Sequence, residues 1–339
     1  MLSRVADSLC WMGRYVERAE NLARLVDVSH HASLDYYASE VGQEHGKRLI
    51  NATDCLADYE LACEEAGEEL DVNAFIMYSV HNPNSVVQCI NHARENARMV
   101  RDQLSESVWL ELNRIHLSLK EMDLPGVWNE EPQELLQEII RFSLLFQGLT
   151  YATNLHDEGW DFVELGRFLE RADKSSRVLD VLTFQENPTR ADIASVLNSC
   201  SGFSAYYHQF KGQISMDNVI MFLLASPKFP RSVRFCLRQV DELLHSISGV
   251  PTGQFSNEAE RITGKLLAQL NFMSQEDIQR VGLHDYIDQI QIDLNLIGQH
   301  IFENFVRLPA ELDDVNLIRQ PGKSFQQQWQ RQWEQQQQQ

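Results

Sequence analysis

The chain contains the stretch GRYVERAE at residues 13–20 and a near copy of it, GRFLERAD, at residues 166–173. A second pair of similar segments follows in the same order, PNSVVQCI at residues 83–90 and PRSVRFCL at residues 230–237. The offsets between the copies are 153 and 147 residues. Two matching pairs in one order and at nearly one offset predict a tandem duplication of a helical unit of about 150 residues.

The composition predicts an all-α fold. Glycine and proline, which interrupt helices, number only 16 and 9 among the 339 residues, and apolar residues recur with the 3.6-residue period of a helix. We therefore expect a tandem-duplicated helical bundle with pseudo-two-fold internal symmetry. The first helical repeat is expected over residues 1–130, and the second, packed on the first, over residues 131–320. Residues 321–339 are rich in glutamine and are expected to form a disordered tail.

The charge balance argues against two classes of partner. The chain has 29 lysines and arginines against 49 aspartates and glutamates, a formal net charge of −20 at pH 7. Nucleic-acid backbones and anionic membrane surfaces attract basic proteins, so neither is expected as a partner. No apolar run approaches the roughly 20 residues that span a bilayer, and the six cysteines are dispersed without a CxxC pair. These features predict buried thiols in a reducing compartment, and hence a cytoplasmic protein.

Neither a metal site nor a bound cofactor is predicted. The glycine-rich loops that hold nucleotide phosphates are absent from the sequence. Glu242 and His245 form one Glu-x-x-His pair, whereas a di-iron bundle requires two such pairs and two further carboxylates. Asp27 and His30 are a poorer candidate, because the second copy of the repeat has a threonine at the position of His30.

The repeated stretch alternates carboxylates with guanidiniums. On a helical wheel the apolar residues of each copy form one stripe, and the charged residues fill the other side. Three interpretations fit this pattern: a solvated face with ordinary ion pairs, a buried network in which each glutamate binds the arginine of the other copy, and a polar pocket for a ligand. The residues concerned are Arg14, Glu17, Arg18, Arg24, Arg167, Glu170, Arg171 and Arg177.

Two further groups of arginines are candidates for anion binding. Arg94, Arg98 and Arg101 share one face of a predicted helix. Arg231 and Arg234 follow a proline at the start of another, where backbone N–H groups are free to bind an anion. The alternative is that these arginines pair with acidic residues of neighbouring helices.

The longest of these motifs resemble the bacterial alpha-E domain family, which is named for its helices and its Glu-Arg motif. The resemblance rests on LSRVADSL at residues 2–9, WMGRYVERAEN at 11–21, ARENAR at 93–98, ER at 170–171 and FPRSVRF at 229–235. It extends over residues 1–308 and implies an all-helical fold. Genes of this family typically lie beside those of a circularly permuted ATP-grasp ligase and a transglutaminase-like protein, so the resemblance implies these two proteins as partners.

The resemblance and the residues together predict a non-catalytic partner or substrate-presenting subunit of an ATP-grasp-dependent peptide- or amide-bond-forming system. One alternative is an enzyme that acts on a small amine or carboxylic acid, with the Glu-Arg clusters as its site. A second alternative is a purely structural scaffold. The enzyme alternative is weakened because neighbouring guanidiniums lower the pKa of a carboxylate, whereas a general base at neutral pH requires a raised pKa.

Overall fold

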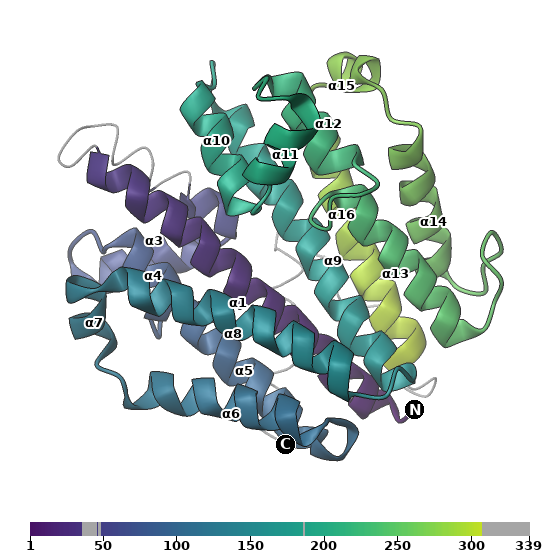
Figure 1. The fold of residues 1–339 in the computed structure, drawn as a ribbon, viewed down its shortest axis with the longest axis horizontal. Helices are drawn as coiled ribbons and strands as arrows, with labels where there is room; N and C mark the ends of the chain where they lie inside the picture. The colour runs from purple at the N-terminus through teal and green to yellow at the C-terminus, as the bar shows by residue number, and fades with distance from the viewer. Residues whose placement is uncertain (36–45, 47–48, 186, 307–339) are drawn as a thin grey trace.

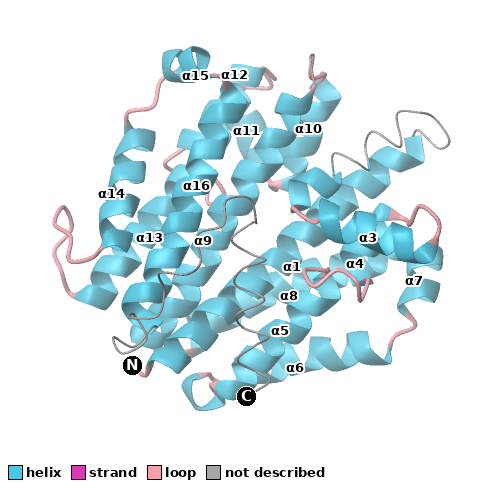
Figure 2. Cartoon of the chain, turned by 180° about the vertical axis from the view of Figure 1, so that it is seen from behind, coloured by secondary structure: helices cyan, strands magenta, loops and turns pink. Residues whose placement is uncertain are grey.

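The computed structural model describes residues 1–35, 46, 49–185 and 187–306. Throughout these residues the chain forms helices and connecting loops and no strand, as Figure 2 shows. The predicted all-α class is therefore confirmed. Within the same ranges, every helix is either too short or too polar to span a lipid bilayer. The tail expected over residues 321–339 lies outside the described residues.

The helices fall into two groups along the chain. The first group consists of α1 (Ser3–Asp35), α3 (Leu56–Ala66), α4 (Val72–Tyr78), α5 (Val86–Met99), η1 (Arg101–Gln103), α6 (Glu106–Glu121), α7 (Leu124–Glu130) and α8 (Pro132–Thr153). The second group consists of α9 (Glu158–Asp180), η2 (Val181–Phe184), α10 (Arg190–Ser199), α11 (Phe203–Phe210), α12 (Met216–Ala225), α13 (Val233–Ser248), α14 (Glu258–Asn271), α15 (Gln275–Val281), α16 (Leu283–Ile301) and η3 (Phe302–Val306).

Local sequence explains where several helices begin. Helices α5, α6 and α13 start directly after Ser85, Ser105 and Ser232, whose side chains accept a hydrogen bond from a backbone N–H in the first turn. A serine in this position satisfies one of the backbone donors that a helix start leaves without a partner. Helices α7 and α8 have a proline in their first turn, where its missing N–H costs no helical hydrogen bond.

Residues with positive φ divide segments that periodicity predicts as single helices. Asp54 at φ 57° does so within a helix predicted over residues 46–69, before the start of α3. Two further segments are divided in the same way. One predicted helix covers residues 189–210, but the structure has α10 and α11, with Ser201 at φ 50° between them. The other covers residues 275–305, where Gly282 at φ 98° separates α15 from α16. A positive φ interrupts a right-handed helix. Hydrophobic periodicity does not report this local property of the backbone, so these predictions of a single helix were wrong.

Helices α1 and α9 pack against each other at an angle, starting side by side near the N-terminus (Figure 1). On one side, α1 packs against α5 and α8, and α6 packs against both of these. On the other side, α9 packs against α13 and α16, and α14 packs against both of these. The buried apolar side chains of the two sides join in one core. The crossing of α1 and α9 therefore lies where the two groups of helices meet.

Two glycines bring the backbones of α1 and α9 into direct contact. A Cβ atom on Gly13 would clash with the carbonyl oxygen of Val163, and one on Gly166 would clash with the carbonyl oxygen of Cys10. These glycines are the first residues of the two repeated stretches. Because only glycine permits so close an approach, the charged residues that follow on both helices are enclosed in the interface.

Candidate functional site: a buried glutamate and arginine network

Glu17 on α1 and Glu170 on α9 are fully buried, and each is bound by an arginine of the other helix. Arg171 donates from Nε and Nη2 to the two carboxylate oxygens of Glu17, at 2.8 and 2.6 Å. Arg18 donates from Nε and Nη2 to the two carboxylate oxygens of Glu170, at 2.6 and 3.1 Å. Two such bidentate pairs fix the distance and rotation of α1 against α9, because a guanidinium and a carboxylate meet in one plane.

Each buried glutamate also has further donors. Arg231 Nη1 and Asn21 Nδ2 donate to Glu17 Oε1 at 3.1 and 2.9 Å. Arg14 Nε donates to Glu170 Oε2 at 2.9 Å. Each carboxylate therefore receives hydrogen bonds on both oxygens, and each is paired with two guanidiniums. This satisfies the requirement that a buried charge be both paired and hydrogen-bonded.

A second pair of carboxylates extends the network along the two helices. Glu20 on α1 accepts hydrogen bonds from Arg24 Nε at 2.8 Å, from Ser143 Oγ at 2.8 Å and from Gln147 Nε2 at 3.0 Å, and it pairs with Arg231. On α9, Asp173 pairs with Arg177 and Lys174 at 3.0 and 3.1 Å. The network thus links α1, α8, α9 and the segment that precedes α13.

The guanidiniums hold the buried glutamates in their ionised form. Burial by itself raises the pKa of Glu17, but Arg171 and Arg231 outweigh this effect and lower the pKa to about 2. Burial opposes ionisation of Glu170 in the same way, and Arg18 with the neighbouring arginine and lysine lowers its pKa well below the ordinary range. Both residues are therefore carboxylates, not carboxylic acids, at neutral pH.

Arg167 is held less completely than the other arginines of the motif. Its Nη1 donates to Gln147 Oε1 at 3.0 Å and it pairs with Glu164, but its buried Nε has no hydrogen-bond partner. Burial and the nearby charge of Arg171 lower the pKa of Arg167 to about 10. Arg167 remains a cation at neutral pH, although the burial of its charge is less well compensated than that of Arg171.

Glu17 and Glu170 are not poised for acid–base chemistry. A general base requires an accessible lone pair and a pKa near the working pH, and the two buried glutamates have neither. A cavity beside Arg18 and Lys174 is about the size of one water molecule. A larger apolar pocket between α1, α9 and α10 is lined by residues such as Leu25, Val178 and Val196 and includes no member of the network.

Comparison with known proteins identifies the family of this chain. A family model described as a predicted alpha-helical domain with a conserved ER motif matches residues 1–306. The chain belongs to the Alpha-E family. It is similar to uncharacterized proteins of Mycobacterium bovis and of two strains of Mycobacterium tuberculosis, with 25% identity over 300 residues. The match covers 82% of this chain but 33% of each relative, so the chain spans about a third of the length of these curated relatives.

No solved structure matches this Alpha-E chain. The Glu-Arg pairs of the two repeated stretches are the residues that join α1 to α9. Glu17 and Arg18 lie next to each other on α1, and Glu170 and Arg171 do so on α9. Each helix therefore both gives an arginine to the other and receives one from it.

The other arginines singled out in the Alpha-E sequence occupy different environments. Arg94 and Arg98 both pair with Glu95, and Arg94 and Arg101 lie over the ring of Trp109. The structure therefore brings these three arginines together at the end of α5, next to an acid and an aromatic ring. This surface group lies outside the buried network.

Arg231 and Arg234 are separated by the structure. Arg231 is buried, and its charge is balanced by Glu17 and Glu20. Arg234 instead donates to Asn271 Oδ1 at 2.7 Å and to the Ala225 carbonyl at 3.1 Å. An anion bound by Arg231 would have to displace two internal carboxylates.

Ser143 and Gln147 of α8 belong to the network, although the sequence analysis did not single them out. Gln147 donates to Glu20 and accepts from both Arg167 and Arg171, so it bridges α1 and α9. One local signal was available: the two residues are spaced i, i+4 within residues 142–155, a stretch without a charged side chain. Polar residues at this spacing lie on one face of a helix.

Proposed function

We propose that this Alpha-E chain is a non-catalytic partner or substrate-presenting subunit of an ATP-grasp-dependent peptide- or amide-bond-forming system. The observation that carries the proposal is the internal pairing of the Glu-Arg motif. Glu17 and Glu170 are buried, ionised and bound by arginines of the same chain, so neither of these two carboxylates is exposed to a substrate. The motif then holds α1 and α9 together, and the partner binds elsewhere on the surface.

The relatives support a role beside other protein domains. In the mycobacterial proteins, the segment similar to this chain accounts for 33% of the length. The rest of those chains is joined covalently to an Alpha-E unit. We take an ATP-grasp-type ligase and a transglutaminase-like protein as the partners, following the resemblance.

The outward face of α8 is the surface we assign to this partner. Leu144 and Leu145 are 51% and 48% exposed, and Tyr151 and Leu155 are 68% and 80% exposed. Between them, Gly148 faces open space. In a chain with a net charge of −20, an uncharged and exposed helix face of this length is unusual, and contiguous exposed apolar surface often marks a protein-binding site.

Two further features belong to the same proposal. The reciprocal pairs between α1 and α9 and the two glycines at their crossing support an origin by tandem duplication with pseudo-two-fold internal symmetry. Six cysteines without a disulfide support a cytoplasmic location. Burial raises the pKa of the Cys89 and Cys236 thiols to about 12, so these two are inert packing residues.

The test is affinity purification of the tagged chain from its native host, with mild crosslinking and mass spectrometry. Wild type is compared with the double variant Leu144→Glu, Tyr151→Glu, which places two charges on the outward face of α8. The control is Phe272→Glu, which charges an equally isolated apolar side chain, 85% exposed, at the end of α14. All three proteins are first checked for equal thermal unfolding.

We expect an ATP-grasp ligase with wild type and with Phe272→Glu, and its loss with the α8 double variant. Recovery of the ligase with all three proteins would support the partner and refute the assigned surface. Absence of any ligase with wild type would contradict the proposed function itself.

A further inference from the structure

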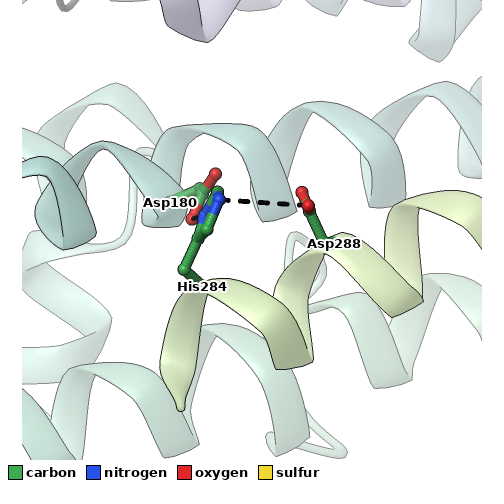
Figure 3. A group of neighbouring side chains, drawn as sticks. All are labelled: Asp180, His284 and Asp288. Atoms are coloured by element: carbon green, nitrogen blue, oxygen red, sulfur yellow. Dashed lines mark hydrogen bonds and ion pairs between the residues drawn. The ribbon is translucent and has the colours of Figure 1, made fainter. Parts of the chain in front are cut away.

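A histidine lies between two aspartates where α9 ends and α16 begins. His284 and Asp288 belong to α16, and Asp180 is the last residue of α9, as Figure 3 shows. The side chain of Asp180 is 11% exposed, whereas those of His284 and Asp288 are 47% and 53% exposed. In the part of the chain that the structure describes, this is the group of acidic and histidine side chains whose donor atoms lie close enough to share a metal ion.

Asp180 fixes the orientation of the imidazole ring. Its Oδ1 lies 2.9 Å from His284 Nδ1 and also accepts a hydrogen bond from the Thr183 hydroxyl at 3.0 Å. A carboxylate at Nδ1 places the ring proton on that nitrogen and leaves the lone pair of Nε2 free. This carboxylate–histidine pair is the arrangement that orients and strengthens histidine ligands in metal sites.

The free nitrogen faces the second aspartate. His284 Nε2 and Asp288 Oδ2 are 3.9 Å apart, and the two residues are four positions apart on one helix face. Bonds from zinc to imidazole nitrogen and to carboxylate oxygen are each about 2.0–2.2 Å. Two such bonds to one ion fit a gap of this size with a small side-chain rotation, and the exposed side leaves room for water ligands.

The local charge also favours a cation. The carboxylates of Asp180, Asp285 and Asp288 all act on the imidazole of His284. The carbonyl groups at the C-terminal end of α9 add negative potential at the same point. These negative charges attract a cation bound at the ring nitrogen.

The fold does not need an imidazole at this position to hold the two helices together. A similar contact occurs at the start of α8, where Gln133 Nε2 donates to Asp27 Oδ1 of α1 at 3.0 Å. Gln133 and His284 are each the second residue of their helix. The side-chain amide of Gln133 is therefore a sufficient donor to Asp27. The equivalent contact to Asp180 does not by itself require the imidazole of His284.

We propose that Asp180, His284 and Asp288 form a divalent-metal site for zinc. His284 Nε2 and Asp288 are the protein ligands, Asp180 orients the histidine, and water completes the coordination. An imidazole ligand selects zinc over magnesium, which prefers oxygen ligands alone. The site was not visible in the sequence because Asp180 and His284 are 104 residues apart.

The experiment is isothermal titration of the full, tag-free chain with zinc chloride, and in parallel with magnesium chloride. The informative variant is His284→Gln, which keeps a donor for Asp180, as Gln133 does for Asp27, but removes the metal ligand. Asp288→Asn removes the second ligand. The matched control is His300→Gln, since His300 Nδ1 lies 2.8 Å from Glu303 Oε2 near the other end of the same helix.

We expect one zinc ion per chain, with affinity at least tenfold lower in His284→Gln and in Asp288→Asn and unchanged in His300→Gln. Asp180→Asn is expected to weaken binding by about 10–100-fold, the usual effect of removing an orienting carboxylate. All variants should keep the thermal midpoint of wild type within a few degrees. Absence of zinc binding by wild type, or equal binding by wild type and His284→Gln, would overturn the proposal.

Discussion

Glu17 and Glu170 carry full charges at positions without contact with solvent. Removing a carboxylate from water costs several kcal/mol, and the cost is recovered only with good geometry and several donors. Both conditions hold here, since each glutamate faces a bidentate arginine and a second guanidinium. At the residue scale, each buried charge of the motif is therefore stable only because oppositely charged groups are bound to it.

Glu17→Gln is expected to destabilise the protein strongly. Arg171 and Arg231 would keep their buried charges but lose part of the balancing charge, and breaking a buried pair on one side costs about 3–5 kcal/mol. Glutamine has nearly the same shape, so the loss does not arise from a cavity. Urea unfolding followed by far-UV circular dichroism measures the change in the free energy of unfolding.

The control for this variant is Glu258→Gln. Glu258 pairs with Arg261 at 2.6 Å, but both side chains are about half exposed, so solvent screens the pair. We expect no measurable change in the urea midpoint of this variant. A Glu17→Gln protein as stable as wild type would show that the buried network is not needed for the fold.

The same carboxylates predict how stability depends on pH. The pKa of Glu17 is about 2 in the folded chain against an ordinary value of 4.5, so the unfolded chain takes up the proton first as the pH falls. The contribution of Glu17 is thus complete above its ordinary pKa and is lost as the pH falls from there towards the folded value. Glu170 acts in the same direction.

Urea unfolding at a series of acidic pH values checks this expectation. The urea midpoint of wild type should fall as the pH is lowered through this window. In Glu17→Gln the fall should be shallower, because one of the titrating groups is absent. Parallel curves for the two proteins would assign the acid sensitivity to other carboxylates.

At the scale of elements, two glycines determine how closely α1 and α9 approach, and the charged pairs form across that short distance. Gly13 and Gly166 bring each backbone against a carbonyl oxygen of the other helix. The paired glutamates, Glu17 and Glu170, lie about one turn further along each helix. If the two backbones were further apart, the arginines of one helix could not bind the glutamates of the other through both Nε and Nη2.

Gly166→Ala is expected to lower stability although alanine is the better helix former. The new Cβ atom would clash with the backbone of Cys10, which cannot rotate away as a side chain can. Overpacking of a core costs about 1–3 kcal/mol, which exceeds the gain of up to about 1 kcal/mol from helix propensity.

Gly148→Ala is the matched substitution within α8. A Cβ atom at Gly148 meets no other atom within 4 Å, so only the propensity term remains. We expect this variant to gain about 0.5–1 kcal/mol. Thermal unfolding of both variants distinguishes the two effects, and a stabilised Gly166→Ala protein would refute the close contact of the helices.

At the scale of the whole molecule, α1 belongs to the cores of both helix groups. It packs against α5 and α8 of its own group and against α9 and α10 of the other group. Of these, α8, α9 and α10 all lie beyond residue 130. In a segment of residues 1–130 alone, much of the apolar surface of α1 would be exposed to solvent. A single core with shared helices unfolds as one cooperative unit.

We therefore expect the isolated segment 1–130 to be largely unfolded and the full chain to show one thermal transition. Calorimetry of the full chain and circular dichroism of the segment provide the measurements. Two separate transitions, or a folded segment with dispersed amide signals in its NMR spectrum, would instead establish residues 1–130 as an independent domain.

The helical class, most helix positions and the residues of the motif could be predicted from the sequence. Helix periodicity and breakers are local properties. They failed where backbone conformation intervened, as at Ser201 and Gly282, and at residues 124–130, where a Pro-Gly break was predicted and α7 forms. Candidate residues could be recognised as well, because their repetition is visible without a structure: Glu17, Arg18, Glu170 and Arg171.

By itself the sequence determined that this chain is helical, that it contains a repeated stretch and that glutamate and arginine alternate within it. Only the tertiary structure decided that these charges are buried, that Gln147 and Arg231 join them, and that His284 lies against Asp180. The physical reason is distance along the chain. Periodicity links residues within a few turns of one helix, whereas Glu17 meets Arg171 across 154 residues, and folding alone brings them together.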